Sequence, residues 1–189
     1  MNITSAKFVK GITTAADAFT DDLPQVACIG RSNVGKSSTI NILTKQKGLA
    51  KTSSFPGRTQ QINLFLINNK FYLVDLPGYG YAKASGAQKK ILGELISDYL
   101  FSAGEQLKKV MLIIDAEIGP TDADLEMLHA LEAYGKTIIV AANKIDKVKK
   151  SHLKRQLDTI RAMVAPHIVM PYSAENRQGV GELSDQLTN

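Results

Sequence analysis

The sequence is nearly devoid of cysteine. Cys28 is the single thiol among 189 residues. One cysteine excludes an internal disulfide and cannot form a CxxC zinc cluster. A chain without disulfides is typical of a reducing compartment, so we expect a cytoplasmic protein.

Long hydrophobic runs are also missing. The longest apolar stretches, such as Val110 to Ile114 and Ile138 to Ala142, are about five residues long, against the ~20 that a membrane-spanning helix needs. The first seven residues contain no uninterrupted apolar stretch and no small-residue cleavage site. We therefore expect neither a secretory signal nor a membrane partner.

Charge of one sign is only slightly in excess. The chain has 23 Lys and Arg against 18 Asp and Glu, a formal net charge of +5, with 44% apolar and 22% charged residues. These are ordinary globular values, and an excess of five charges does not by itself identify an anionic partner. The length fits one domain spanning residues 1–189, with residues 1–23 as an N-terminal extension, and we expect a monomer.

Short apolar runs alternate with amphipathic stretches along the chain. This alternation predicts an α/β fold with a doubly wound, mostly parallel sheet covered by helices on both faces. Asn68-Asn69 marks a tight hairpin and so an antiparallel edge strand. Residues 7–10 fit an extra edge strand and residues 17–22 fit a surface loop. The predicted strands are 25–29, 62–67, 71–74, 110–114, 137–142 and 168–170, and the predicted helices are 36–46, 86–102, 122–134, 151–163 and 180–187.

A phosphate-binding loop follows the first predicted core strand. The residues match G-x-x-x-x-G-K-[ST], a pattern in which backbone N–H groups surround phosphate oxygens at a helix N-terminus. Lys36 would reach the β- and γ-phosphates, and the Ser37 hydroxyl would bind Mg²⁺. A glycine-rich turn without a ligand is the alternative. The predicted nucleotide-binding residues here are Gly30, Arg31, Ser32, Asn33, Val34, Gly35, Lys36, Ser37 and the following Ser38.

A second motif selects the base. Asn143-Lys144-Ile145-Asp146 follows a predicted strand at the carboxyl edge of the sheet, where ligands of such folds bind. The Asp146 carboxylate can accept hydrogen bonds from both N1–H and the 2-amino group of guanine, a donor pair that adenine lacks. A solvated turn is the alternative for this motif taken alone. Behind a phosphate loop, Asn143, Lys144 and Asp146 predict GTP and GDP as ligands.

Three further segments complete the predicted site. Asp75-Leu76-Pro77-Gly78 closes a strand, so that Asp75 can hold Mg²⁺ and the Gly78 N–H can contact the γ-phosphate. Upstream, Gly57-Arg58-Thr59 lies in a turn-prone loop, and Thr59 is the second candidate hydroxyl for Mg²⁺. Ser173-Ala174 suits a loop that packs on the base. The predicted metal ligands are thus Ser37, Thr59 and Asp75, and the residues predicted to act on the phosphates are Lys36, Thr59, Gly78 and Asn33.

In these motifs the sequence resembles the EngB (YihA/YsxC) family of ribosome-biogenesis GTP-binding proteins. The resemblance rests on Gly30 to Ser38, Thr52 to Gln60 and, most specifically, Leu73 to Ala82, and it extends over most of the chain. Asn143 stands where that family usually has Thr, although Asn is common at this position in related GTPases. The resemblance implies a slow, Mg²⁺-dependent GTPase that assists assembly of the large ribosomal subunit or its precursor, contacts ribosomal RNA and is linked to cell division and septation.

Two residues bear on how GTP would be hydrolysed. Many such switches have a water-orienting Gln after Asp-x-x-Gly, but here the residue is Tyr79, so we expect slow intrinsic turnover. Tyr79 fits either loop packing or a surface read by a partner. Asn33 lies where similar potassium-stimulated GTPases use an Asn oxygen to hold K⁺, and this likeness implies K⁺ as a further cofactor. Arg31 and Arg58 are alternative sources of positive charge.

The basic residues cluster in one window. Residues 144–161 contain seven Lys or Arg and two Asp, a balance of +5 that equals the net charge of the chain. Either this is a solvated helix face or it contacts RNA phosphates.

Two other functions stay open at this point: a small-molecule P-loop kinase, and a GTPase of a membrane or tRNA-modification system.

Overall fold

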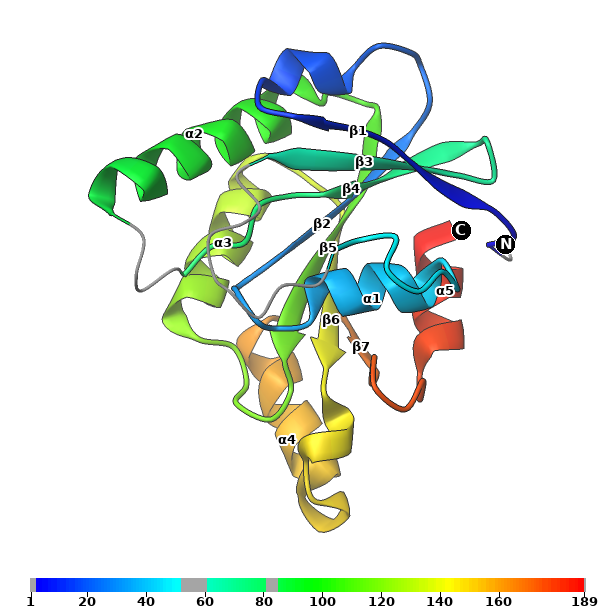
Figure 1. Ribbon diagram of the computed structural model, residues 1–189. Coiled ribbons are helices and arrows are strands. Elements are labelled where there is room, and N and C mark those ends of the chain that lie inside the picture. The colour runs from blue at the N-terminus through cyan, green and yellow to red at the C-terminus, as the bar shows by residue number, and fades with distance from the viewer. Residues whose placement is uncertain (1–2, 52–60, 81–84, 189) are drawn as a thin grey trace.

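A seven-stranded sheet forms the centre of the computed structural model, which describes residues 3–51, 61–80 and 85–188 (Figure 1). The strand order is β1-β3-β4-β2-β5-β6-β7. The strands are β1 Ala6–Ile12, β2 Gln25–Gly30, β3 Ile62–Ile67, β4 Phe71–Asp75, β5 Leu107–Asp115, β6 Ile138–Asn143 and β7 Ile168–Pro171.

Parallel pairing dominates the sheet and antiparallel pairing is confined to one side. β4, β2, β5, β6 and β7 are parallel neighbours, whereas β3 runs antiparallel to both β1 and β4. The predicted hairpin is confirmed, because Asn68 and Asn69 both adopt positive φ, at 52° and 54°. The edge strand predicted at residues 7–10 is also confirmed, as part of β1.

Helices cover both faces of the sheet, as the alternation of strands and helices predicts. The helices are α1 Lys36–Leu43, α2 Gly86–Ser102, α3 Asp122–Ala133, α4 Lys150–Met163 and α5 Val180–Thr188, with short 3₁₀ turns η1 Ala15–Ala18 and η2 Ile145–Lys147. Buried residues of α2, α3 and α4 share one core cluster, and those of α1 and α5 share the other. The sheet therefore separates two hydrophobic cores, with helices on both of its faces (Figure 1).

The strand predicted at 110–114 begins earlier, at Leu107, and two other predicted boundaries are wrong. The first helix ends at Leu43 instead of Gln46, because Lys45 takes a left-handed φ of 55° and the Gln46 side-chain amide donates to the carbonyl of Ala6 at 2.6 Å. The loop predicted at 17–22 begins inside η1, whose Ala18 is buried against the first core cluster. Both differences come from contacts between segments distant in sequence, which local patterning does not encode.

No helix within the described ranges is both long and apolar enough to cross a bilayer.

Candidate functional site

The phosphate loop connects β2 to α1 at the carboxyl edge of the sheet. Gly30 is the last residue of β2, and Gly35 precedes α1 with a left-handed φ of 96°. A Cβ on Gly30 would lie 2.6 Å from the Ile113 carbonyl oxygen, and one on Gly35 would lie 2.4 Å from Nδ2 of Asn143. Glycine is required at both positions because neighbouring strands approach the loop so closely.

The N-terminus of α1 is open toward this loop. None of the side chains that the structure describes caps it, and the first amide N–H groups of any α-helix lack acceptors within the helix. Such groups bind anions, and the helix dipole adds to the attraction. The N-terminus of α1 and the turn before it thus have the form of a phosphate cradle.

The predicted phosphate lysine and metal carboxylate lie together. Lys36 Nζ forms an ion pair with Asp75 Oδ1, and Asp75 is only 3% exposed at the end of β4. Ser37, the next residue of α1, is half-buried. A carboxylate and a serine hydroxyl are both hard oxygen donors of the kind that Mg²⁺ prefers, so the chemistry of Asp75 and Ser37 fits this ion.

Asn143 joins the two nucleotide motifs. This side chain is 2% exposed at the end of β6. Its Nδ2 donates to the Val34 carbonyl at 2.8 Å, and its Oδ1 accepts from the Ala174 N–H at 3.0 Å. One buried amide therefore connects the phosphate loop, the Asn-Lys-x-Asp motif and the loop after β7.

Lys144 adds a second link between the same loops. Its Nζ donates to the Asn33 carbonyl at 3.0 Å and pairs with Asp115 Oδ2 at 2.6 Å. Asp115, at the end of β5, is 4% exposed and was not among the residues that the motifs predicted. A signal was available, since an acid ends the apolar run of β5 and lies opposite Asn143 in the parallel register.

Asp146 and the loop after β7 provide the base-binding candidates. Asp146 lies in η2, is exposed and takes no hydrogen bond or ion pair from any described residue. Ser173 is buried, and its Oγ accepts from the N–H groups of Glu175 and Asn176 at 3.2 and 3.1 Å. This turn fixes the Ala174 backbone on Asn143 while the Asp146 carboxylate stays available to a ligand.

The segment after β4 packs on the phosphate loop. Leu76 and Pro77 are buried, and Gly78 lies so close that a Cβ there would be 3.3 Å from both the Gly30 oxygen and Ser32 Oγ. The Tyr79 hydroxyl donates to Asp124 of α3 at 2.7 Å, which fits the loop-packing interpretation of Tyr79. Burial, followed by the charge of Asp124, raises the pKa of Tyr79 well above its ordinary value.

The remaining predicted residues differ in how far they can be placed. Arg31 forms an isolated backbone bridge with Tyr79, and the side chains of Asn33 and Ser38 are exposed. Gly57, Arg58 and Thr59 lie outside the described residues, so Thr59 as the second hydroxyl for Mg²⁺ stays a prediction.

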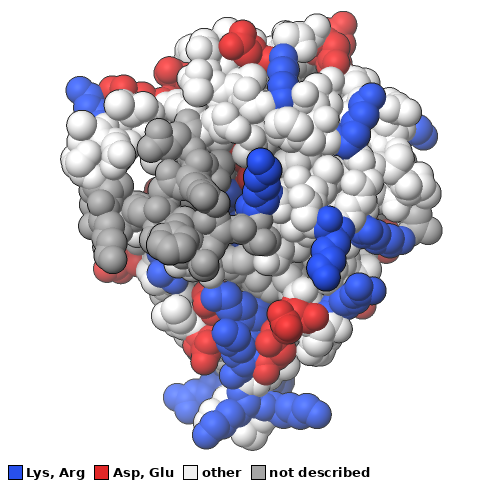
Figure 2. Space-filling view, viewed as in Figure 1, with Lys and Arg blue, Asp and Glu red and all other residues white. Residues whose placement is uncertain are grey.

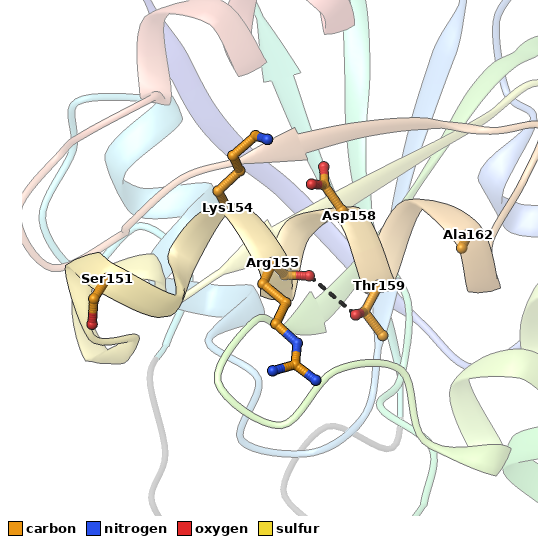
Figure 3. Close-up of a pocket in the computed structure, with 6 residues that line it drawn as sticks. All are labelled: Ser151, Lys154, Arg155, Asp158, Thr159 and Ala162. Carbon is orange, nitrogen blue, oxygen red and sulfur yellow. Dashed lines mark hydrogen bonds between the residues drawn. The ribbon is translucent and has the colours of Figure 1, made fainter.

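The basic window forms an exposed surface on and before α4, which we call the α4 basic surface. Lys and Arg gather at this lower end of the molecule (Figure 2). An open hollow of about 570 Å³ runs along α4, lined by Ser151, Lys154, Arg155, Asp158, Thr159 and Ala162 (Figure 3). Asp158 pairs with Arg161 at 3.0 Å. The exposed basic residues of this surface are Lys147, Lys149, Lys150, Lys154, Arg155 and Arg161.

The histidines take no part in the site. His129 Nδ1 and His167 Nε2 lie 3.0 and 2.7 Å from the two carboxylate oxygens of Glu132. These hydrogen bonds, first that of His129, lower the pKa of Glu132. No cluster of metal-ligating His, Cys, Asp or Glu occurs among the residues that the structure describes.

Comparison with known proteins places the chain in a family. Residues 25–144 match the model of the 50S ribosome-binding GTPase family. The "Probable GTP-binding protein EngB" of Clostridium kluyveri is 44% identical over 185 residues, covering 96% of this chain and 93% of the relative. That of Acholeplasma laidlawii is 45% identical over 162 residues, covering 86% and 84%.

Solved structures agree on the fold. A crystal structure of a probable GTP-binding protein EngB superposes with a TM-score of 0.74 at 21% identity, covering 87% of this chain and 96% of the other. Era in complex with MgGDPNP and nucleotides 1506–1542 of 16S ribosomal RNA gives 0.68 at 25% identity, covering 87% and 55%. The activity of this family is GTP hydrolysis, so the match disfavours the small-molecule kinase as the function of the chain. The chain belongs to the EngB family of GTP-binding proteins, which are P-loop GTPases.

Proposed function

We propose that this GTPase is a Mg²⁺-dependent switch whose nucleotide state controls its binding to RNA of the large ribosomal subunit or its precursor, and which thereby assists assembly. The observation that carries the proposal is the buried amide of Asn143, which bonds to Val34 and Ala174. These contacts bring the phosphate loop and the base-binding loops to one edge of the sheet. The exposed Asp146 carboxylate at this edge is free to recognise guanine.

The phosphates are the centre of the proposed chemistry. Lys36 and the N-terminal N–H groups of α1 bind them, and the Gly78 N–H contacts the γ-phosphate. Ser37, Thr59 and Asp75 would hold Mg²⁺, which when bound neutralises charge on the β- and γ-phosphate oxygens. Leu76 and Pro77 are buried in the segment that carries Gly78, and Gly57 and Arg58 remain predicted nucleotide-binding residues.

Turnover by the chain alone should be slow. Tyr79 occupies the position of the usual water-orienting Gln, and its hydroxyl is already engaged by Asp124. The Asn33 side chain is exposed within the phosphate loop, and we include K⁺, held by its amide oxygen, in the proposal. A bound K⁺ would offset charge that develops during phosphoryl transfer.

The proposed partner is RNA, approached by the α4 basic surface. Six exposed Lys and Arg face solvent there, and among the acids of the same window only Asp158 pairs with one of them, Arg161. Phosphate backbones attract such surfaces and release counterions on binding. The matching family is described as 50S ribosome-binding, and the Era neighbour was solved with ribosomal RNA, which supports this choice of partner. The links to cell division and septation, a cytoplasmic location and a monomeric state complete the proposal.

Sedimentation of the purified chain with large ribosomal subunits tests the proposal. We expect the chain to pellet with the subunits in a non-hydrolysable GTP analogue and to remain free in GDP. The matched control is Asp146→Asn, which should pellet only when the analogue carries xanthine in place of guanine. Equal pelleting in both nucleotides would contradict nucleotide control. No pelleting in either nucleotide would contradict the large ribosomal subunit as the partner.

A further inference from the structure

Tyr79 is held at both of its polar ends. Its hydroxyl donates to Asp124 Oδ1 at 2.7 Å, and its carbonyl accepts the Ser32 N–H at 3.1 Å. The first contact reaches α3 and the second reaches the phosphate loop. The residue therefore ties the segment after β4 to two elements that are distant in sequence.

The acceptor on α3 is itself fixed. Asp124 is 1% exposed. Its other carboxylate oxygen accepts from the Thr121 N–H at 2.9 Å and from Thr121 Oγ1 at 2.7 Å, in the capping box that begins α3. A buried carboxylate with both oxygens hydrogen-bonded cannot move without breaking the helix cap.

The contacts of Tyr79 hold the neighbouring residue Gly78 against the phosphate loop. It precedes Tyr79 and lies against Gly30 and Ser32, with room for no more than a tight Cβ contact at 3.3 Å. On the other side, Gly80 takes a left-handed φ of 71° and a Cβ there would lie 2.8 Å from Cγ of Arg31. The chain from Gly78 to Gly80 is thus packed directly on the phosphate loop.

We infer that Tyr79 and Asp124 are positioning residues that hold the Gly78 N–H at the phosphate loop before the γ-phosphate arrives. This inference rests on the proposed contact between Gly78 and the γ-phosphate. A donor that is already placed loses less conformational freedom on binding, which strengthens affinity without any new contact to the ligand. Only GTP gains from it, because GDP has no γ-phosphate.

The inference predicts selective damage when the hydroxyl is removed. Tyr79→Phe keeps the ring and loses the bond to Asp124. A hydrogen bond to a charged group typically contributes enough to change an equilibrium about tenfold. We expect the affinity for a non-hydrolysable GTP analogue to fall about tenfold, while the affinity for GDP changes less than about twofold because its contacts do not involve Gly78.

Tyr134→Phe is the matched control. The Tyr134 hydroxyl bonds to Ser97 of α2 and lies at the C-terminal end of α3. This change also removes a phenol hydroxyl bonded to a neighbouring element, but far along the helix from Asp124. It should leave the ratio of the two affinities unchanged.

The experiment is equilibrium titration of each variant with fluorescent GDP and with the fluorescent GTP analogue. An unchanged affinity ratio in Tyr79→Phe, or an equal ratio change in Tyr134→Phe, overturns the inference. Failure of the wild-type chain to prefer guanine over adenine nucleotides would instead overturn the proposed base-recognition site, so the two failures can be distinguished.

Discussion

At the scale of single residues, the site depends on a few buried polar groups. Asn143 and Asp115 are almost inaccessible, yet each bonds to groups on other loops. A buried polar group that loses its partner costs about 1 to 3 kcal/mol, so these residues hold the loops in one arrangement. Asp146 and Asn33 are exposed instead, which leaves both side chains accessible to the ligands proposed for them.

Asn33 supports a prediction about salt. If its amide oxygen holds K⁺ at the phosphates, GTP hydrolysis should be about tenfold or more faster in KCl than in NaCl. Asn33→Gly should abolish the difference, because glycine tolerates the left-handed φ of 67° at this position and removes only the side chain. Phosphate release at equal ionic strength measures both rates, with choline chloride as control. Equal turnover of the wild-type chain in the two alkali salts would refute the role of Asn33.

At the scale of elements, the turn between β3 and β4 shows how local chemistry fixes topology. The Lys70 N–H donates to the Ile67 carbonyl at 2.8 Å across Asn68 and Asn69. Asn68 Oδ1 also accepts from the N–H groups of Thr4 and Ser5, which ties the start of β1 to the hairpin. The turn therefore organises all three antiparallel strands.

Asn69→Gly should stabilise this hairpin. Asn69 adopts φ of 54° and is exposed, and glycine accepts this conformation without steric cost. We expect the free energy of unfolding to rise by about 0.5 kcal/mol, and to fall by about 1 kcal/mol in Asn69→Ala. Urea denaturation of the two variants beside the wild-type chain measures both. A more stable alanine variant than glycine variant would contradict the assigned turn.

Sequence patterns predicted the elements better than the contacts between them. The alternation of apolar runs and amphipathic stretches predicts the sheet and its helices because burial imposes it on local sequence. Lys36 and Asp75 are predictable because a phosphate loop and Asp-x-x-Gly are each contiguous motifs. The bond between Tyr79 and Asp124 joins residues 45 positions apart, and that between Lys144 and Asp115 joins residues 29 apart. The acid that ends the apolar run of β5 can be noticed in the sequence, but the pairings themselves become visible only once the chain is folded.

At the scale of the whole molecule, charge is distributed unevenly. The α4 basic surface begins at Lys147 of η2, the same turn that carries Asp146, so the proposed partner would dock next to the proposed base-binding motif. Lys144 connects this region to the phosphate loop through Asn33. Docking at α4 and nucleotide binding therefore involve neighbouring segments of one chain.

A triple variant tests the α4 basic surface. We expect affinity for an RNA duplex to depend less steeply on salt in the variant that combines Lys150→Ala, Lys154→Ala and Arg155→Ala. The slope of log affinity against log salt should become shallower by about 2 to 3. The control triple Lys7→Ala, Lys70→Ala and Lys108→Ala changes the same net charge at exposed positions outside α4. Fluorescence anisotropy over a salt series measures the slopes, with anionic lipid vesicles as a second probe. Equal slopes for both triples, or loss of vesicle binding in place of RNA binding, would contradict an RNA surface.

The proposed function depends on Asp146 recognising guanine at a site whose loops are held together by Asn143. The most direct measurement is the affinity of wild-type and Asp146→Asn chains for GTP and xanthosine triphosphate. The side-chain amide of Asn can donate a hydrogen bond where the carboxylate accepted one. The affinity of the variant for GTP should therefore fall about 100-fold or more, and its affinity for xanthosine triphosphate should rise, because the 2-oxo group of xanthine accepts that hydrogen bond. Unchanged GTP affinity in Asp146→Asn would contradict the account.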